Sequence, residues 1–125
     1  MPNISQMAGT SPITLKAQLS EVLATANTAT LIVQNQFGCG FVPVAATAFC
    51  SAIGAGAATL DVQVAGATIM NATIAFVANS AVAGTVISGT AIANATDISF
   101  IISNQSGGNL VDSAVTLTGY VTHTS

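Results

Sequence analysis

The side chains that could carry out acid–base, nucleophilic or metal-ligand chemistry are few in this chain of 125 residues. Four carboxylates, one imidazole, two thiols and one amine make up the set, at Glu21, Asp61, Asp97, Asp112, His123, Cys39, Cys50 and Lys16. Hydrolytic and acid–base sites combine several such groups, and a catalytic thiol needs a basic partner that lowers its pKa. The single histidine lies beside the end of the sequence, away from both thiols. The sequence therefore predicts a protein that is not an enzyme, with no catalytic residue and no cofactor.

The three aspartates could gather around a calcium ion, because calcium takes oxygen ligands. Asp61, Asp97 and Asp112 do not follow the spacing of an EF-hand loop. Solvated carboxylates on the faces or ends of strands are the favoured alternative, so no metal site is expected. The glycine pairs at 38–40 and 54–56 lack the Gly-Lys-Ser/Thr of a phosphate loop, and turns explain them better.

Two cysteines, Cys39 and Cys50, are close enough in the sequence for a disulfide to be considered. Such a bond would contribute about 2–4 kcal/mol in a compartment that allows oxidation. In a protein assembled in a cytoplasm, cysteines more often remain small buried hydrophobic side chains. Both alternatives stay open from the sequence.

The composition excludes several classes of partner. Only 4% of the residues are charged, 51% are hydrophobic, and the net charge is −3 with Lys16 as the only permanent cation. Nucleic-acid binding needs several Lys or Arg side chains to neutralise phosphates, and anionic membrane surfaces attract the same residues. A small domain with so little charge is expected to bury much of its surface between subunits, so we predict a homo-oligomer.

The strongest alternative to such an assembly is a membrane span. The uncharged segment 37–60 has the length to cross a bilayer, but four glycines and Pro43 interrupt it and no basic residue flanks it. The first seven residues have neither the basic region nor the apolar run of a signal peptide. We therefore expect that the protein makes no contact with a membrane. We also expect that it is made and assembled in a cytoplasm.

Short alternating runs of Val, Ile, Leu and Thr, separated by Gly, Asn and Ser, predict strands throughout the chain. The expected strands are 13–19, 28–34, 41–49, 59–64, 67–70, 73–77, 84–88, 97–103 and 114–121. A hairpin is expected about Gly66, and Pro43 favours an edge strand or a strand start over a central position. Residues 20–26 could instead form a short helix that begins at Ser20. This spacing predicts one antiparallel sandwich or barrel over residues 13–125, after a flexible N-terminal arm over residues 1–12.

Five segments carry a resemblance to a known family. They are the hairpin TLDVQVAGATI, the loop AGTVISG, the strand NATDISFIIS, the turn NQSGGN and the closing strand VTLTGYV. Together, over Phe41 to Val121, the chain resembles the jelly-roll domains of tailed-bacteriophage virion proteins, which include capsid decoration (cement) proteins and head fibres. A second resemblance is to the trimeric C1q- and TNF-like jelly roll. Both imply an all-β, antiparallel, jelly-roll-like β-sandwich that forms a homotrimer.

The resemblance implies a structural virion protein on the capsid surface. Its partner would be the major capsid protein of a phage, and residues 1–12 would clamp neighbouring capsid subunits. Three alternatives stay open: a receptor- or glycan-binding phage fibre tip that uses a loop such as 103–109, a C1q/TNF-like surface domain, and an ice-binding protein with threonine-rich faces.

Overall fold

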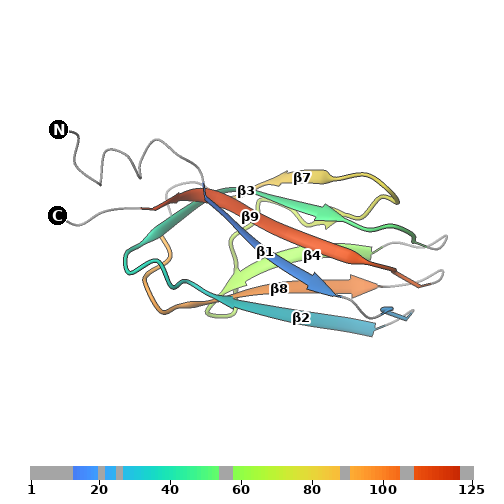
Figure 1. Cartoon of the computed structure of the whole chain (residues 1–125), viewed down its shortest axis with the longest axis horizontal. Coiled ribbons are helices and arrows are strands. Elements are labelled where there is room, and N and C mark those ends of the chain that lie inside the picture. Colours follow the sequence, from blue (N-terminus) through green and yellow to red (C-terminus); the bar gives the residue numbers. More distant parts are fainter. Residues whose placement is uncertain are drawn as a thin grey trace.

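The computed structural model describes residues 13–19, 22–24, 27–53, 58–87, 91–104 and 109–121. Over these residues the chain forms two antiparallel sheets that face each other (Figure 1). The strands are β1 Ile13–Leu19, β2 Asn27–Gln34, β3 Phe41–Phe49, β4 Ala58–Val64, β5 Ala67–Thr68, β6 Ile74–Ala75, β7 Val82–Thr85, β8 Asp97–Asn104 and β9 Ser113–Val121. The expected arm over residues 1–12, Glu21 and His123 lie outside the described residues.

The order of the strands identifies the type of sandwich. One sheet has the order β1-β9-β3-β7, and the other has the order β2-β8-β4-β5 with β6 also paired to β4. The first and last strands are therefore neighbours, and the chain passes from one sheet to the other between β1, β2, β3 and β4. This is the order of a jelly roll, so the predicted all-β, jelly-roll-like sandwich is confirmed.

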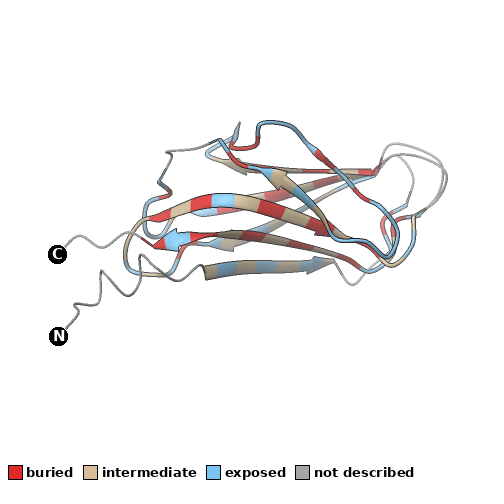
Figure 2. Cartoon of the chain, turned by 90° about the horizontal axis from the view of Figure 1, so that it is seen from above, coloured by how far each residue is buried: buried red, intermediate tan, exposed pale blue. Residues whose placement is uncertain are grey.

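Alternation of side chains along the strands builds the core between the two sheets. In β8 and β9, every second residue is buried. Figure 2 shows bands of buried residues alternating with less buried ones along strands of the sandwich. The largest side chains with essentially no exposure are Phe41, Phe100, Leu60, Ile92, Ile98, Ile102, Leu110 and Leu117. Strict period-two burial of this kind is what a sheet with one covered face requires.

The predicted hairpin about Gly66 is confirmed. Val64 of β4 pairs with Ala67 of β5, which leaves Ala65 and Gly66 as the two turn residues. Their φ angles are 54° and 81°. Two positive φ angles define the type I′ turn, whose twist matches the twist of the flanking strands.

The helix considered for residues 20–26 is wrong where the structure describes that segment. The backbone N–H of Leu23 donates to the carbonyl of Leu110 at 2.9 Å, and the reverse bond has the same length. Leu23 therefore forms an antiparallel bridge with Leu110 in place of the backbone hydrogen bonds of a helix. Within the described ranges, no helix has the length and apolar character needed to cross a bilayer.

Pro43 is the third residue of β3, near the start of its strand, which is one of the two positions predicted for it, although β3 is not an edge strand. β3 lies between β9 and β7, but its register with β9 shifts between Pro43 and Ala45. On its other side, β7 pairs only with Ala45 to Ala48. The missing N–H of Pro43 thus falls at a bulge beyond the end of β7, where no ladder bond is lost.

Candidate functional site

The aspartates that could have gathered around calcium lie apart. Asp61 is in the middle of β4, where it accepts hydrogen bonds from Gln63 Nε2 at 2.9 Å and Thr68 Oγ1 at 2.5 Å. Asp97 begins β8, and Asp112 directly precedes β9 in the other sheet. In the described part of the chain, no three His, Cys, Asp or Glu side chains come together in a way that could hold a metal ion.

The two cysteines are free thiols at opposite ends of β3. Cys39 is half-buried before the strand, and Cys50 is buried after it. The nine residues of β3 between them span roughly 30 Å at about 3.3 Å per residue, whereas a disulfide joins Cα atoms about 4.4–6.8 Å apart. The candidate disulfide between Cys39 and Cys50 is therefore not formed within this chain. Burial raises the pKa of the Cys50 thiol, which keeps it protonated and unreactive.

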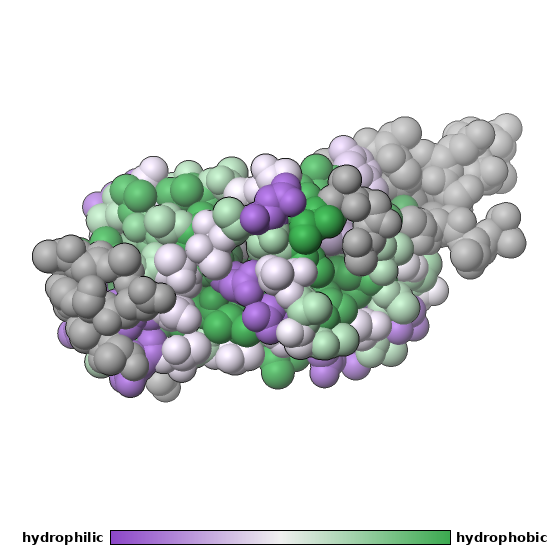
Figure 3. Space-filling view, turned by 180° about the vertical axis from the view of Figure 1, so that it is seen from behind, coloured by the Kyte–Doolittle hydropathy of each residue, from purple (hydrophilic) through white to green (hydrophobic). Residues whose placement is uncertain are grey.

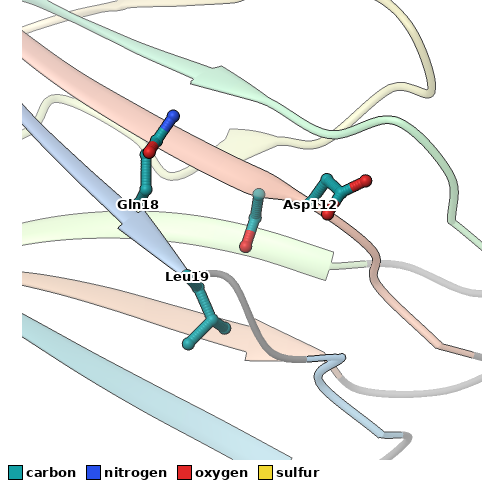
Figure 4. A pocket seen from close by; sticks show the side chains of 4 residues that line it. Gln18, Leu19 and Asp112 are labelled. Carbon is teal, nitrogen blue, oxygen red and sulfur yellow. The ribbon is translucent and has the colours of Figure 1, made fainter.

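An open pocket of about 240 Å³ lies where β1 ends beside the start of β9. Its lining residues are Gln18, Leu19, Asp112 and Ser113, and Gln18 and Leu19 extend to opposite sides of β1 (Figure 4). Ser113 Oγ is buried and has no hydrogen-bond partner among the described residues. The Asp112 carboxylate accepts a bond from Ser51 Oγ at 3.1 Å. The pocket therefore has a polar floor, but its lining offers no imidazole or amine to activate the hydroxyl.

The core of the sandwich is incompletely covered along one side, at its edge strands β1 and β2. The residues of these strands that face the core are all only partly buried: Ile13, Leu15, Ala17, Leu19, Ala29, Leu31 and Val33. The residues opposite them on the next strand inward are fully buried. Leu117 lies opposite Leu15 and Phe100 lies opposite Leu31, and both are 0% exposed. We call these seven side chains the open seam.

The edge strand β2 has none of the usual features that block pairing with another chain. Its sequence NTATLIVQ contains no charge and no proline, and its register with β8 is regular from Asn27 to Gln34. Edge strands of monomeric proteins are commonly interrupted by lysine, proline or a bulge. β1 carries Lys16 at its centre, and β7 is four residues long. β2 is therefore the long, uncharged edge of the described structure.

The backbone of β2 presents alternate residues to this free edge. The N–H of Asn35 donates to the Thr96 carbonyl at 2.9 Å, and its carbonyl accepts from Ala95 N–H at 2.7 Å. Odd-numbered residues thus direct their backbone groups toward β8, because the direction alternates along an antiparallel strand. The even-numbered residues Thr28, Thr30, Ile32 and Gln34 direct theirs away from it. Their side chains are exposed as well, and Ile32 is 62% exposed.

The surface of the sandwich is mixed and nearly uncharged. Figure 3 shows hydrophobic and intermediate side chains interspersed across the face opposite to that of Figure 1, with strongly hydrophilic side chains only in small groups. In addition to Ile32, the exposed large hydrophobic side chains are Val22, Val44, Val77, Ile87 and Tyr120. Such a surface suits contact with other uncharged protein surfaces.

The open seam was not predicted from the sequence. Local alternation predicts that Leu31 faces a core, but it does not say which strand lies at the edge of a sheet. The available signal was the absence of charge from residues 27–34, next to a strand that carries Lys16.

No family model matches the chain, and no curated protein matches it. Among solved structures, that of FlhE is similar over 90% of this chain and 98% of its own, with 7% identity and a TM-score of 0.51. A structure of Bacillus endospore appendages, described as disulfide-linked pili, covers 98% of this chain and 100% of its own, with 13% identity and a TM-score of 0.38. The likeness to FlhE concerns the fold alone.

Proposed function

We propose that this chain is a non-catalytic structural protein that works as an assembly of its own copies, as a decoration protein on the outside of a phage head. The observation that carries the proposal is the open seam beside an uncharged edge strand. A jelly roll that leaves seven core-facing side chains partly exposed gains stability when another protein surface covers them.

The chemistry of the described residues supports a structural role over a catalytic one. The pocket beside Ser113 holds a hydroxyl without a basic partner, and the carboxylates of Asp61 and Asp112 are taken up by neighbouring hydroxyl and amide groups. The phage-head assignment rests on the resemblance of the hairpin and strand segments between Phe41 and Val121 to virion jelly rolls. In this role the protein would hold capsid subunits together through its contacts.

This proposal is tested by locating the protein on phage particles, or on cells, in cultures of the organism that produces it. An antibody against the full chain, with gold detection by electron microscopy, should label the surface of phage heads. Label at fibre tips would favour the receptor- or glycan-binding alternative. Label on cells or spores, with none on heads, would contradict the decoration role and favour a surface domain of another kind.

A further inference from the structure

We infer that the free edge of β2 is the site at which a second copy of this chain binds, by antiparallel pairing of β2 with β2 across a two-fold axis at Leu31. The inference rests on the part of the proposed function in which copies assemble with one another. It goes further, because it names the strand, the register and the symmetry of the contact.

Backbone geometry restricts the registers that are possible. Only Thr28, Thr30, Ile32 and Gln34 direct N–H and carbonyl groups to the free edge, so even-numbered residues must pair with even-numbered residues. Within 27–34, the axes that pair most residues pass through Thr30 or Leu31. An axis through Thr30 places Asn27 against Val33 on the core-facing side. An axis through Leu31 avoids this mismatch.

The register about Leu31 is self-complementary on both faces of the strand. On the core-facing side, Leu31 meets its own copy and Ala29 meets Val33. On the outer side, Thr30 meets Ile32 and Thr28 meets Gln34. The pairing extends the β2-containing sheet of one copy into that of the next, and it covers the three β2 residues of the open seam with apolar neighbours.

The charge of the chain favours a second copy over a charged partner. β2 has no ionisable side chain to attract phosphates, anionic lipids or an oppositely charged protein. Each copy has a net charge of −3, but no charged residue lies in β2 to oppose another β2. The contact would therefore be stabilised by backbone hydrogen bonds and apolar burial, with little dependence on salt.

A two-fold contact predicts two copies, or a multiple of two, in place of the trimer implied by the resemblance. Cysteine cross-linking tests the axis directly in the full chain. With the axis at Leu31, L31C places two thiols in a non-hydrogen-bonded pair, where Cα atoms are about 4.5 Å apart and within disulfide range. The matched control is A29C, on the same face of β2, whose two copies lie about four residues apart.

The expected result is a covalent dimer on mild oxidation of L31C, and no more dimer from A29C than from the unmodified chain with its own two cysteines. Equal cross-linking of both variants, or none, would overturn the inference. Cross-linking tests the β2 contact alone, whereas gold labelling tests the phage-head role. Failure of one proposal can therefore be distinguished from failure of the other.

A second variant keeps the test valid if L31C folds poorly. I32K places two lysines diagonally across the axis, about 7–8 Å apart, at a position whose side chain is already 62% exposed. We expect I32K to halve the native mass, and V77K, at a 49% exposed site away from β2, to leave it unchanged. Equal masses for the two variants would count against the β2 contact.

Discussion

Asn35 fastens two loops at one end of the sandwich through a single buried side chain. Its Nδ2 donates to the carbonyls of Cys39, Ile92 and Ala93 at 3.1, 2.9 and 3.2 Å, and its Oδ1 accepts from the N–H of Phe37 at 3.1 Å. The side chain is 0% exposed. These bonds join residues 37–39 to residues 92–93, which are far apart in the sequence. The polar side chain of Asn35 therefore has a structural role.

We predict that N35D destabilises the protein by roughly 2–4 kcal/mol at neutral pH, because a carboxylate would face carbonyl oxygens without a donor. The loss should shrink as the pH falls, since the neutral acid regains one donor. The control is N94D, because the one side-chain bond of Asn94 among the described residues uses its Oδ1, which accepts from the N–H of Gly38 at 2.9 Å. Urea unfolding of both variants at several pH values measures the effect, and equal losses would contradict this role.

The two thiols should differ in reactivity. Cys50 is 0% exposed and burial raises its pKa, so its reactive thiolate is scarce, whereas Cys39 is partly exposed. We expect a thiol reagent to modify Cys39 at least tenfold faster in the native protein, and both equally in denaturant. Timed alkylation followed by peptide mass spectrometry measures the two rates. Similar native rates, or a bond between Cys39 and Cys50, would contradict the described arrangement of β3.

At the scale of the strands, Gly119 allows β9 to approach β3 where β3 bulges. A Cβ at this position would lie 2.1 Å from the carbonyl oxygen of Val42 and 2.7 Å from the Cα of Pro43. Those atoms belong to the backbone and can move only if the bulge moves. Gly84 in β7 is also crowded, but there a Cβ would meet the side chain of Ile74 at 2.5 Å.

We therefore predict that G119A costs roughly 2–4 kcal/mol and that G84A costs less, about 1 kcal/mol, because the Ile74 side chain can change rotamer. Thermal and urea unfolding of the two variants give the comparison. A smaller loss for G119A than for G84A would mean that the β3 bulge adapts more readily than the structure implies.

Several strands could be predicted from the sequence because their alternation is local. Residues 13–19 and 41–49 were predicted with the bounds of β1 and β3, and the turn at Gly66 was predicted from its glycine. Pro43 was predicted to lie in an edge strand or at a strand start, and it lies near the start of β3. The bulge that accommodates its missing N–H inside the sheet could not be predicted, because the bulge depends on the pairing of β3 with β9. The open seam was missed for a related reason: which strand forms an edge depends on pairing between distant segments.

On the scale of the whole molecule, residues 1–12 precede a domain whose described strands start at Ile13. The decoration proposal assigns these residues to contact with capsid subunits. We predict that deleting them leaves the circular dichroism spectrum unchanged and the free energy of unfolding within about 1 kcal/mol of that of the full chain, since β1 keeps its full pairing with β9. Sedimentation with phage heads should show lost attachment. Retained attachment would contradict a role for these residues in binding.

The proposed assembly depends on copies of the chain that cover one another's uncharged surface. The measurement that tests this most directly is the native mass of the purified full chain at micromolar concentration, by light scattering on a sizing column. We predict a mass of two copies of 12.3 kDa, or of a multiple of two copies. Three copies would retain the assembly but contradict the two-fold β2 contact, and a stable monomer would contradict the central claim.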